Sequence, residues 1–316
     1  MFLQRGKSFG FILIFILLLL GLAALPFFVD LFYQTFLTEL FVWILFAISF
    51  DLIFGYTGLL SFGHAMFFGV GAYAMALVLI RWMPSLFVAF LTGTILSLIL
   101  AFVIGFLSIR RKGIYFVMIT LAFCQMVYFV ALKWSSLTGG DNGLHGVQRP
   151  SIGPIDLNVE IVFYYFVLFV FVLSVIAAFR IINSPFGRVL RSLKDNEDRA
   201  RSIGYNTYRF KLLSFMISAA FASLAGGLYA IHSNFVPLET LHIDTSLNVV
   251  IMTLVGGVGT LYGPIFGAMF IVILKNILSN WLGNWNLIMG LIFILSVLTL
   301  RKGLLPVLKE YLWVKK

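Results

Sequence analysis

Charged residues are scarce in this chain. Asp, Glu, Lys and Arg together form 11% of its 316 residues, whereas they form about a quarter of an ordinary soluble sequence. Hydrophobic residues form 61%, which is more apolar surface than a soluble protein of this length can bury. The scarcity of charge therefore excludes a soluble protein. It predicts an all-α polytopic membrane protein, because many apolar runs approach the roughly 20 residues that a membrane helix needs.

Several chemical motifs are absent as well. The single cysteine, Cys124, lies in an apolar run, which excludes an intramolecular disulfide and argues against a thiolate metal site. There is no Gly-x-x-x-x-Gly-Lys-Ser/Thr phosphate-binding loop, and the four histidines show no His-Glu-x-x-His pattern. Membrane-embedded pairs of acidic residues, which would suggest proton coupling, are also absent. An intramembrane enzyme is therefore not expected, and neither a metal nor a cofactor is expected in this chain.

Apolar runs follow one another along the chain, and no hydrophilic block is long enough to form a soluble domain. We therefore expect a single transmembrane domain over residues 1–316 with about ten spans. The first run follows Arg5 and Lys7 and resembles a signal peptide, but it lacks a small-x-small cleavage site, and we interpret it as a retained span. The predicted spans are 9–29, 36–54, 62–80, 85–108, 113–132, 161–182, 211–231, 246–260, 263–281 and 285–300.

Lys and Arg concentrate in alternate connections, which orients the spans by the positive-inside rule. They mark the N-terminus, the turn at 110–112, the segment 183–211 and the tail after 300, whereas acidic residues prevail in the loop 133–160. This pattern predicts an outer loop at 133–160, a cytoplasmic loop at 183–211 and cytoplasmic termini. Topology and contact with anionic membrane lipid account for the net charge of +10 without any nucleic acid.

The cytoplasmic loop has features that a simple basic loop does not need. Pro185 and Gly187 turn the chain out of the sixth span, a short amphipathic helix is expected from 188 to 203, and Gly204 can end it with a positive φ. Such a helix can insert into a groove on a partner protein. The alternative is a basic loop that lies on lipid, but the acidic residues Glu197 and Asp198 and the glycine stop favour docking. The candidate docking residues are Arg188, Arg191, Asn196, Glu197, Ala200, Ile203 and Gly204.

Two glycine-rich stretches interrupt the apolar runs. The first runs from Gly55 to Tyr73 and the second from Gly256 to Phe270. Each has glycines at a helix break and further glycines one turn apart on the next helix. Such glycines either allow close helix packing, which we favour for Gly71 and Gly267, or mark a broken helix on a transport pathway. We expect the first stretch to be a broken, closely packed helix on that pathway. The candidate pathway residues are Asp51, Gly55, Tyr56, Gly58, Ser61, Gly63, His64, Gly69, Gly256, Gly257, Gly259 and Gly263.

Ionisable side chains inside the apolar runs are few. Asp51 and His64 flank the first break, and we favour structural roles for both, with Asp51 accepting backbone N–H bonds that cap the break. Lys275 lies within the ninth predicted span, and we expect its side chain to extend outward to the membrane surface.

Taken together, these motifs resemble the LivM-type permeases of the branched-chain amino acid class of ABC importers. Four stretches carry the resemblance, in the family's order: the second-span signature Gly55-Tyr-Thr-Gly58 with Ser61-Phe-Gly-His64, the outer-loop motif Thr138-Gly-Gly-Asp-Asn-Gly-Leu144, the coupling loop from Asn196 to Gly204, and Gly256-Gly-Val-Gly-Thr-Leu-Tyr-Gly-Pro264. The chain departs from the family at Asp51, often Asn, and at Leu59, often Gln. It has Asp198-Arg199-Ala200 where importer permeases have Glu-Ala-Ala, and its Glu stands one place earlier, as Glu197.

The resemblance implies a transport subunit in a bacterial inner membrane and not an enzyme. The implied fold resembles the vitamin B12 importer type of permease. The implied partners are a sister permease, two cytoplasmic ATPase subunits that bind ATP and Mg, and a soluble or lipid-anchored solute-binding protein. That protein would dock on the outer loop at Thr138, Gly139, Gly140, Asp141, Asn142 and Gly143.

The implied substrates are leucine, isoleucine and valine, with urea or a short amide as the alternative. A stand-alone secondary carrier or channel is the remaining possibility, and it would transport without ATP or partner subunits.

Overall fold

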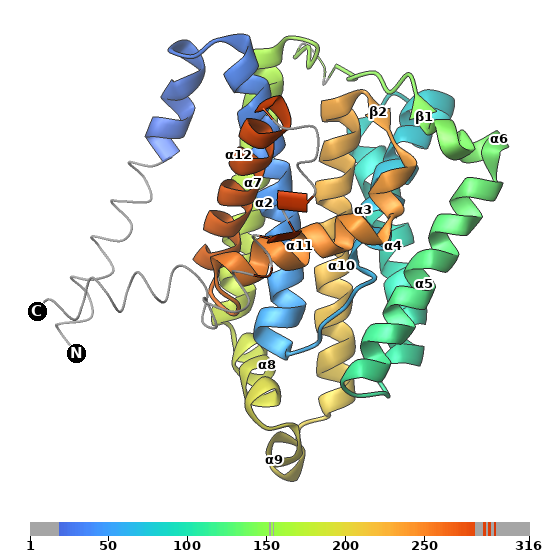
Figure 1. The fold of residues 1–316 in the computed structure, drawn as a ribbon, viewed down its shortest axis with the longest axis vertical. Helices are drawn as coiled ribbons and strands as arrows, with labels where there is room; N and C mark the ends of the chain where they lie inside the picture. Colours follow the sequence, from blue (N-terminus) through green and yellow to red (C-terminus); the bar gives the residue numbers. More distant parts are fainter. Residues whose placement is uncertain are drawn as a thin grey trace, which may run out of the picture.

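The computed structural model describes residues 19–281 apart from 152 and 154, together with a few isolated positions between 287 and 294. Within this part of the chain the protein is a bundle of long helices, and its single sheet consists of two strands of two residues each (Figure 1). Seven helices are long and apolar enough to cross a membrane. They are α2 (Leu31–Thr57), α3 (His64–Leu77) with its π-helical extension η2 (Val78–Trp82), α4 (Leu86–Ser108), α5 (Ile114–Lys133), α7 (Glu160–Asn183), α10 (Thr207–Ser233) and α12 (Tyr262–Trp281).

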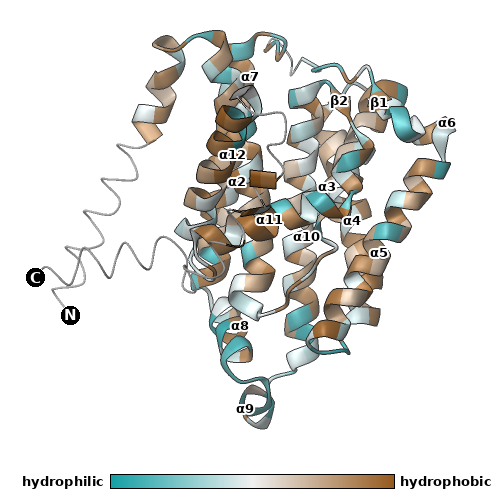
Figure 2. Cartoon of the chain, in the orientation of Figure 1, coloured by the Kyte–Doolittle hydropathy of each residue, from teal (hydrophilic) through white to brown (hydrophobic). Residues whose placement is uncertain are grey.

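Short elements connect the long helices at the two ends of the bundle. One end carries α6 (Ser135–Thr138), η3 (Gly140–Asn142) and η4 (Leu238–Leu241), together with β1 (Leu144–His145), which pairs antiparallel with β2 (Phe235–Val236). The opposite end carries α8 (Pro185–Asp195) and α9 (Glu197–Ser202) (Figure 1). Figure 2 shows that both ends are hydrophilic and that the helices between them are mainly hydrophobic, which is the distribution that a bilayer requires.

The seven long helices coincide, within a few residues at most ends, with the predicted spans from 36–54 to 211–231 and with 263–281. The predicted total of ten is not confirmed. Most of the span 9–29 and most of the span 285–300 lie outside the described residues.

The predicted span 246–260 is wrong as a full crossing. Its helix, α11, runs from Ile243 to Gly256 and has 14 residues, which gives a length of about 21 Å against a hydrocarbon thickness of about 30 Å. The helix ends at Gly257, whose φ of 119° is unfavourable for any residue with a side chain. The chain continues through a non-helical turn into α12, so the break lies within the bundle.

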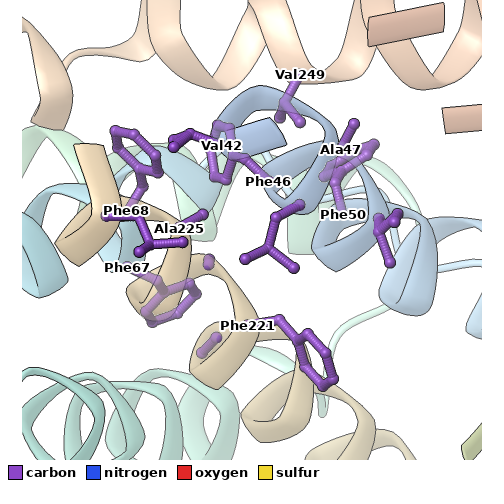
Figure 3. Packing of buried hydrophobic residues seen from close by; sticks show 14 of the residues in the cluster. Val42, Phe46, Ala47, Phe50, Phe67, Phe68, Phe221, Ala225 and Val249 are labelled. Carbon is purple, nitrogen blue, oxygen red and sulfur yellow. The ribbon is translucent and has the colours of Figure 1, made fainter. Parts of the chain in front are cut away.

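The core forms where α10 packs against α2, α3 and α4. Phenylalanines from three of these helices fill it, with Phe46 and Phe50 on α2, Phe67 and Phe68 on α3, and Phe221 on α10 (Figure 3). The backbones approach closely at glycines. A Cβ on Gly71 would collide with the carbonyl oxygen of Ser223, and one on Gly226 would collide with that of Phe68. Small residues therefore bring α3 and α10 together, as in many membrane helix pairs.

Polar side chains join α2 and α10 inside this core. The hydroxyl groups of Thr57 and Ser214 are 2.7 Å apart, and Ser218 Oγ donates to the Ser49 carbonyl at 2.6 Å. His64 Nε2 lies 2.8 Å from Ser49 Oγ. Such hydrogen bonds hold helices together where lipid offers no alternative partner.

Candidate functional site

The two glycine-rich breaks meet in the structure, although the two residues that join them, Asp51 and Gly259, are 208 positions apart in the sequence. Asp51 on α2 is fully enclosed, and its Oδ1 accepts a hydrogen bond of 2.8 Å from the backbone N–H of Gly259. Non-helical backbone at membrane depth is tolerated only where protein or water satisfies its polar groups. Asp51 therefore caps a break, as expected from the sequence, but the break it caps is the one between α11 and α12.

A lysine from α8 reaches the same place. Lys194 Nζ donates to the carbonyl oxygen of Gly55 at 2.7 Å, and it would lie 3.2 Å from a Cβ built on Gly259. Next to it, the Arg191 guanidinium stacks over the Tyr56 ring at 5.4 Å. We call Asp51, Gly55, Lys194 and Gly259 the junction. Hydrogen bonds tie the end of α2 to the helix α8 through Lys194 and to the break after α11 through Asp51.

The segment that leads away from the junction consists of two helices, and the single helix predicted over 188–203 is wrong. α8 begins at the cap Ser184 with Pro185 in its first turn and ends at Asp195. Asn196 has an extended backbone and begins α9, where its Oδ1 accepts from the Arg199 N–H at 2.9 Å. The side chain of Asn196 competes with a continuous helix by capping a new one.

Most of the apolar side chains in this segment face the protein's own bundle. Leu190, Leu193 and Ala200 are buried, whereas Ile203 is 71% exposed. Gly204 follows it with a φ of 99°, as expected for a glycine stop, and no atom would lie within 4 Å of a Cβ at that position. Of the predicted docking residues, Arg188, Arg191 and Asn196 are exposed as well. The tip at Ile203 and Gly204 is therefore an exposed apolar corner in a polar end of the molecule.

Glu197 makes ion pairs with two other segments and with its own helix. It pairs with Lys211 at the start of α10 at 2.8 Å, with Lys112 in the α4–α5 turn at 3.1 Å, and with Arg201 at 3.5 Å. Partial burial acts to raise the pKa of Glu197, but the hydrogen bonds and charges of Lys211 and Lys112 outweigh it and leave the pKa below its ordinary value. Glu197 therefore positions α9, and this internal role was missed when it was grouped with the docking residues.

The remaining pathway candidates are packed inside the bundle. Ser61 and His64 are buried, and Ser61 Oγ accepts from the Gly63 N–H at 3.3 Å. Cβ atoms on Gly63 and Gly69 would collide with the Thr120 carbonyl and with Leu241, respectively. In the second break, Gly256 and Gly257 are buried, and Cβ atoms on Gly256 and Gly263 would collide with the carbonyls of Gly263 and Gly257. Close packing accounts for these positions, and their place on a pathway stays a prediction.

Gly58 has a different role from the other glycines of the first break. A Cβ at this position would meet only Lys194, whose Cγ is nearest at an ordinary contact distance of 3.4 Å. Its backbone, however, ends α2 in the left-handed region, with a φ of 77°. Conformation and not close approach therefore requires glycine here, and the expectation of close packing is wrong for Gly58.

The outer-loop motif folds into a compact turn. Thr138 Oγ1 donates to the Ala131 carbonyl at 2.6 Å and accepts from the Gly140 N–H at 3.2 Å, and Gly139, Gly140 and Gly143 all have positive φ. Asp141 and Asn142 are left exposed. These contacts explain the motif as a turn, and docking of a second protein on it stays a prediction.

A cavity of about 210 Å³ lies between α2, α11 and α12. None of the pathway candidates from the two glycine-rich stretches lines this cavity. Instead it is lined by Phe36, Glu39, Trp43, Asn248, Met252, Ile271, Val272, Lys275, Asn276 and Ser279. Lys275, expected to extend outward, lines this cavity and is half-buried. The signal that could have found the cavity was the occurrence of Glu39 and Lys275 within two of the predicted spans, 36–54 and 263–281.

Curated proteins of similar sequence are transport permeases. The chain is 28% identical over 297 residues to the high-affinity branched-chain amino acid transport system permease protein LivM of Salmonella typhimurium, covering 87% of this chain and 70% of that protein, and equally to LivM of Escherichia coli. It is 28% identical over 254 residues to a probable LivM of Methanocaldococcus jannaschii, covering 69% and 72%. No solved structure matches, so the resemblance to the vitamin B12 importer type stays a prediction.

The same assignment follows from the family described as "Branched-chain amino acid transport system / permease component", whose model matches residues 32–297. That range includes both glycine breaks, the outer loop, α8 and α9. The chain therefore belongs to the family of branched-chain amino acid transport system permease components.

Proposed function

We propose that this chain is the membrane-spanning permease subunit of an ATP-driven importer for leucine, isoleucine and valine. The match of residues 32–297 to the permease family carries the proposal. The names of the LivM relatives supply the substrate class. The proposed location is a bacterial plasma membrane, and the basic residues of the α8–α9 end favour the cytoplasmic side for that end.

Two cytoplasmic ATPase subunits would bind ATP and Mg²⁺, because the sequence contains no phosphate-binding loop of its own. The exposed corner at Ile203 and Gly204 is the part of α9 that suits an apolar groove on such a subunit. A sister permease and a solute-binding protein on the opposite end complete the proposed assembly. Urea or a short amide is the alternative substrate class.

Cross-linking tests the docking. In a Cys124→Ala background, Ile203→Cys should cross-link to a cysteine on the ATPase, because this side chain is exposed. Ala200→Cys is the matched control, since Ala200 is only 2% exposed and should not react. An assembled complex in which position 203 forms no cross-link would contradict docking through this corner.

Transport by the reconstituted importer tests the function. Leucine, isoleucine or valine uptake into proteoliposomes should require ATP, the ATPases and the binding protein together. Uptake by this chain alone, driven by an ion gradient, would instead establish a secondary carrier. Strict selectivity for urea would leave the proposed ATP-driven mechanism unchanged and would replace the three amino acids by urea as the substrate.

A further inference from the structure

The cavity between α2, α11 and α12 combines two opposite charges with an apolar wall. Glu39 comes from α2 and Lys275 from α12, while Asn248 and Asn276 add amide groups from α11 and α12. Ionisable side chains at membrane depth are unfavourable, and where they persist they usually serve a function. A pair of opposite charges around one small cavity is an arrangement that a solute without charged groups does not need.

The remaining wall is hydrophobic, with Trp43 and Met252 among its residues. The Trp43 indole N–H donates to Glu39 Oε1 at 3.2 Å, so it fixes the carboxylate beside the apolar surface. The volume of about 210 Å³ is smaller than the roughly 300–1,000 Å³ of pockets for drug-sized ligands. The cavity therefore suits a small solute with a positive group, a negative group and an apolar side chain.

We propose that this cavity is a transient binding site for a zwitterionic, aliphatic α-amino acid on its way through the membrane. Glu39 receives the ammonium group, Lys275 and the neighbouring amides receive the carboxylate, and Trp43 and Met252 contact the aliphatic side chain. The assignment rests on the proposed import function and adds a site within this chain to it.

The position of the cavity supports a role in transport. α11 contributes Asn248 and Met252 to its wall and ends shortly after them at the break that Asp51 of α2 caps. Lys194 of α8 bonds to α2 one turn beyond Asp51, at Gly55. A displacement of α8 by an ATPase would therefore act on the helix that lines the cavity. The amino acid would be held or released according to the position of that helix.

The test uses the complete importer in proteoliposomes and measures leucine uptake and binding-protein-stimulated ATP hydrolysis in parallel. Glu39→Gln removes the charge that receives the ammonium group, and Met252→Trp fills the cavity. Asp156→Asn, in the loop before α7, and Ile99→Trp, exposed on α4, are the matched controls for lost charge and added bulk. Both controls should behave as the wild type.

Each cavity variant should lower leucine uptake at least about ten-fold, as expected for one lost charged hydrogen bond or a blocked site. ATP hydrolysis should stay within about two-fold of wild type, since the motor and its docking are unchanged. Wild-type uptake in both variants would overturn the site, and so would a parallel fall in uptake and hydrolysis. If the wild-type importer carries none of the three amino acids, the proposed function fails and the amino acid site fails with it.

Discussion

At the scale of single residues, the described structure depends on glycines, which have no side chain, and on polar side chains buried against backbone atoms. Gly226 lets α10 contact the backbone of α3, where a Cβ would collide with the Phe68 carbonyl. Asp51 satisfies the N–H of Gly259 from a helix more than two hundred residues away. Both positions act on backbone atoms, which cannot move aside as a flexible side chain can.

Gly226→Ala should destabilise the folded protein by roughly 2 kcal/mol or more, because the added methyl group forces two packed helices apart. Gly21→Ala is the control, since a Cβ at Gly21 has no atom within 4 Å. Thermal unfolding in detergent, followed by size-exclusion chromatography, measures the difference. Equal melting temperatures for the two variants would contradict the close approach of α3 and α10.

Asp51→Leu should destabilise the junction by roughly 1–3 kcal/mol, because it leaves the Gly259 N–H without its acceptor in a buried place. Asp51→Asn keeps an oxygen at the same position and should restore most of the stability. The same unfolding assay separates the two. If leucine and asparagine are equally harmful, the charge opposite Lys194 and not the hydrogen bond accounts for Asp51.

At the scale of helices, short elements between the long ones position the polar ends of the molecule. α9 has six residues and is too short to be stable by itself. Its place depends on the Asn196 cap and on the ion pairs that Glu197 makes with Lys112 and Lys211. The exposed Ile203 is therefore presented by a local cap and by contacts with two other parts of the chain, the α4–α5 turn and α10.

Glu197→Gln should loosen α9 and lower coupling between ATP hydrolysis and uptake. The effect depends on pH with a definite sign. Because the pKa of Glu197 is lower in the folded protein than its ordinary 4.5, its stabilisation is fully present above that value and is lost as pH falls through the lowered pKa. The difference in melting temperature between wild type and Glu197→Gln should therefore be constant near neutral pH and shrink in acid.

Asp198→Asn provides the matched control for this experiment. Asp198 lies next to Glu197, but its side chain is 82% exposed and 3.8 Å from Lys112, so its ion pair contributes little. The variant should melt and transport as the wild type does. An equal effect of both variants would indicate a general loss of negative charge at this end.

The sequence predicted the long helices well because their apolar runs match the bilayer thickness. It failed where a tertiary contact decided the structure. Hydropathy cannot show that α11 stops at Gly257, since Asp51 supplies the hydrogen bond that makes this break acceptable. The sequence motif indicates the coupling segment, but the inward orientation of Glu197 depends on Lys112 and Lys211 in other segments. The kink at Asn196 comes from a local cap, which the preference of Asn for helix N-termini could have indicated.

At the scale of the whole molecule, the two hydrophilic ends define the proposed orientation in the membrane. Asp141 lies at the end with β1 and β2, and Asp195 lies at the end with α8 and α9, and both are exposed (Figure 1). In a Cys124→Ala background, Asp141→Cys should react with an impermeant thiol reagent added to intact cells. Asp195→Cys should react only after the membrane is opened. The opposite pattern would reverse the orientation.

The ion pairs of Glu197 also set a condition for exchanging parts between transporters. A chimera that receives only residues 184–206 from another permease would keep Lys112 and Lys211 of the recipient. If the donor's acidic residue stands one position later, as in the Glu-Ala-Ala pattern, these lysines would meet it one residue, or about 100° of helix rotation, out of place. Altering the ATPase partner of this permease by grafting therefore requires exchange of the α4–α5 turn and the first two turns of α10 as well.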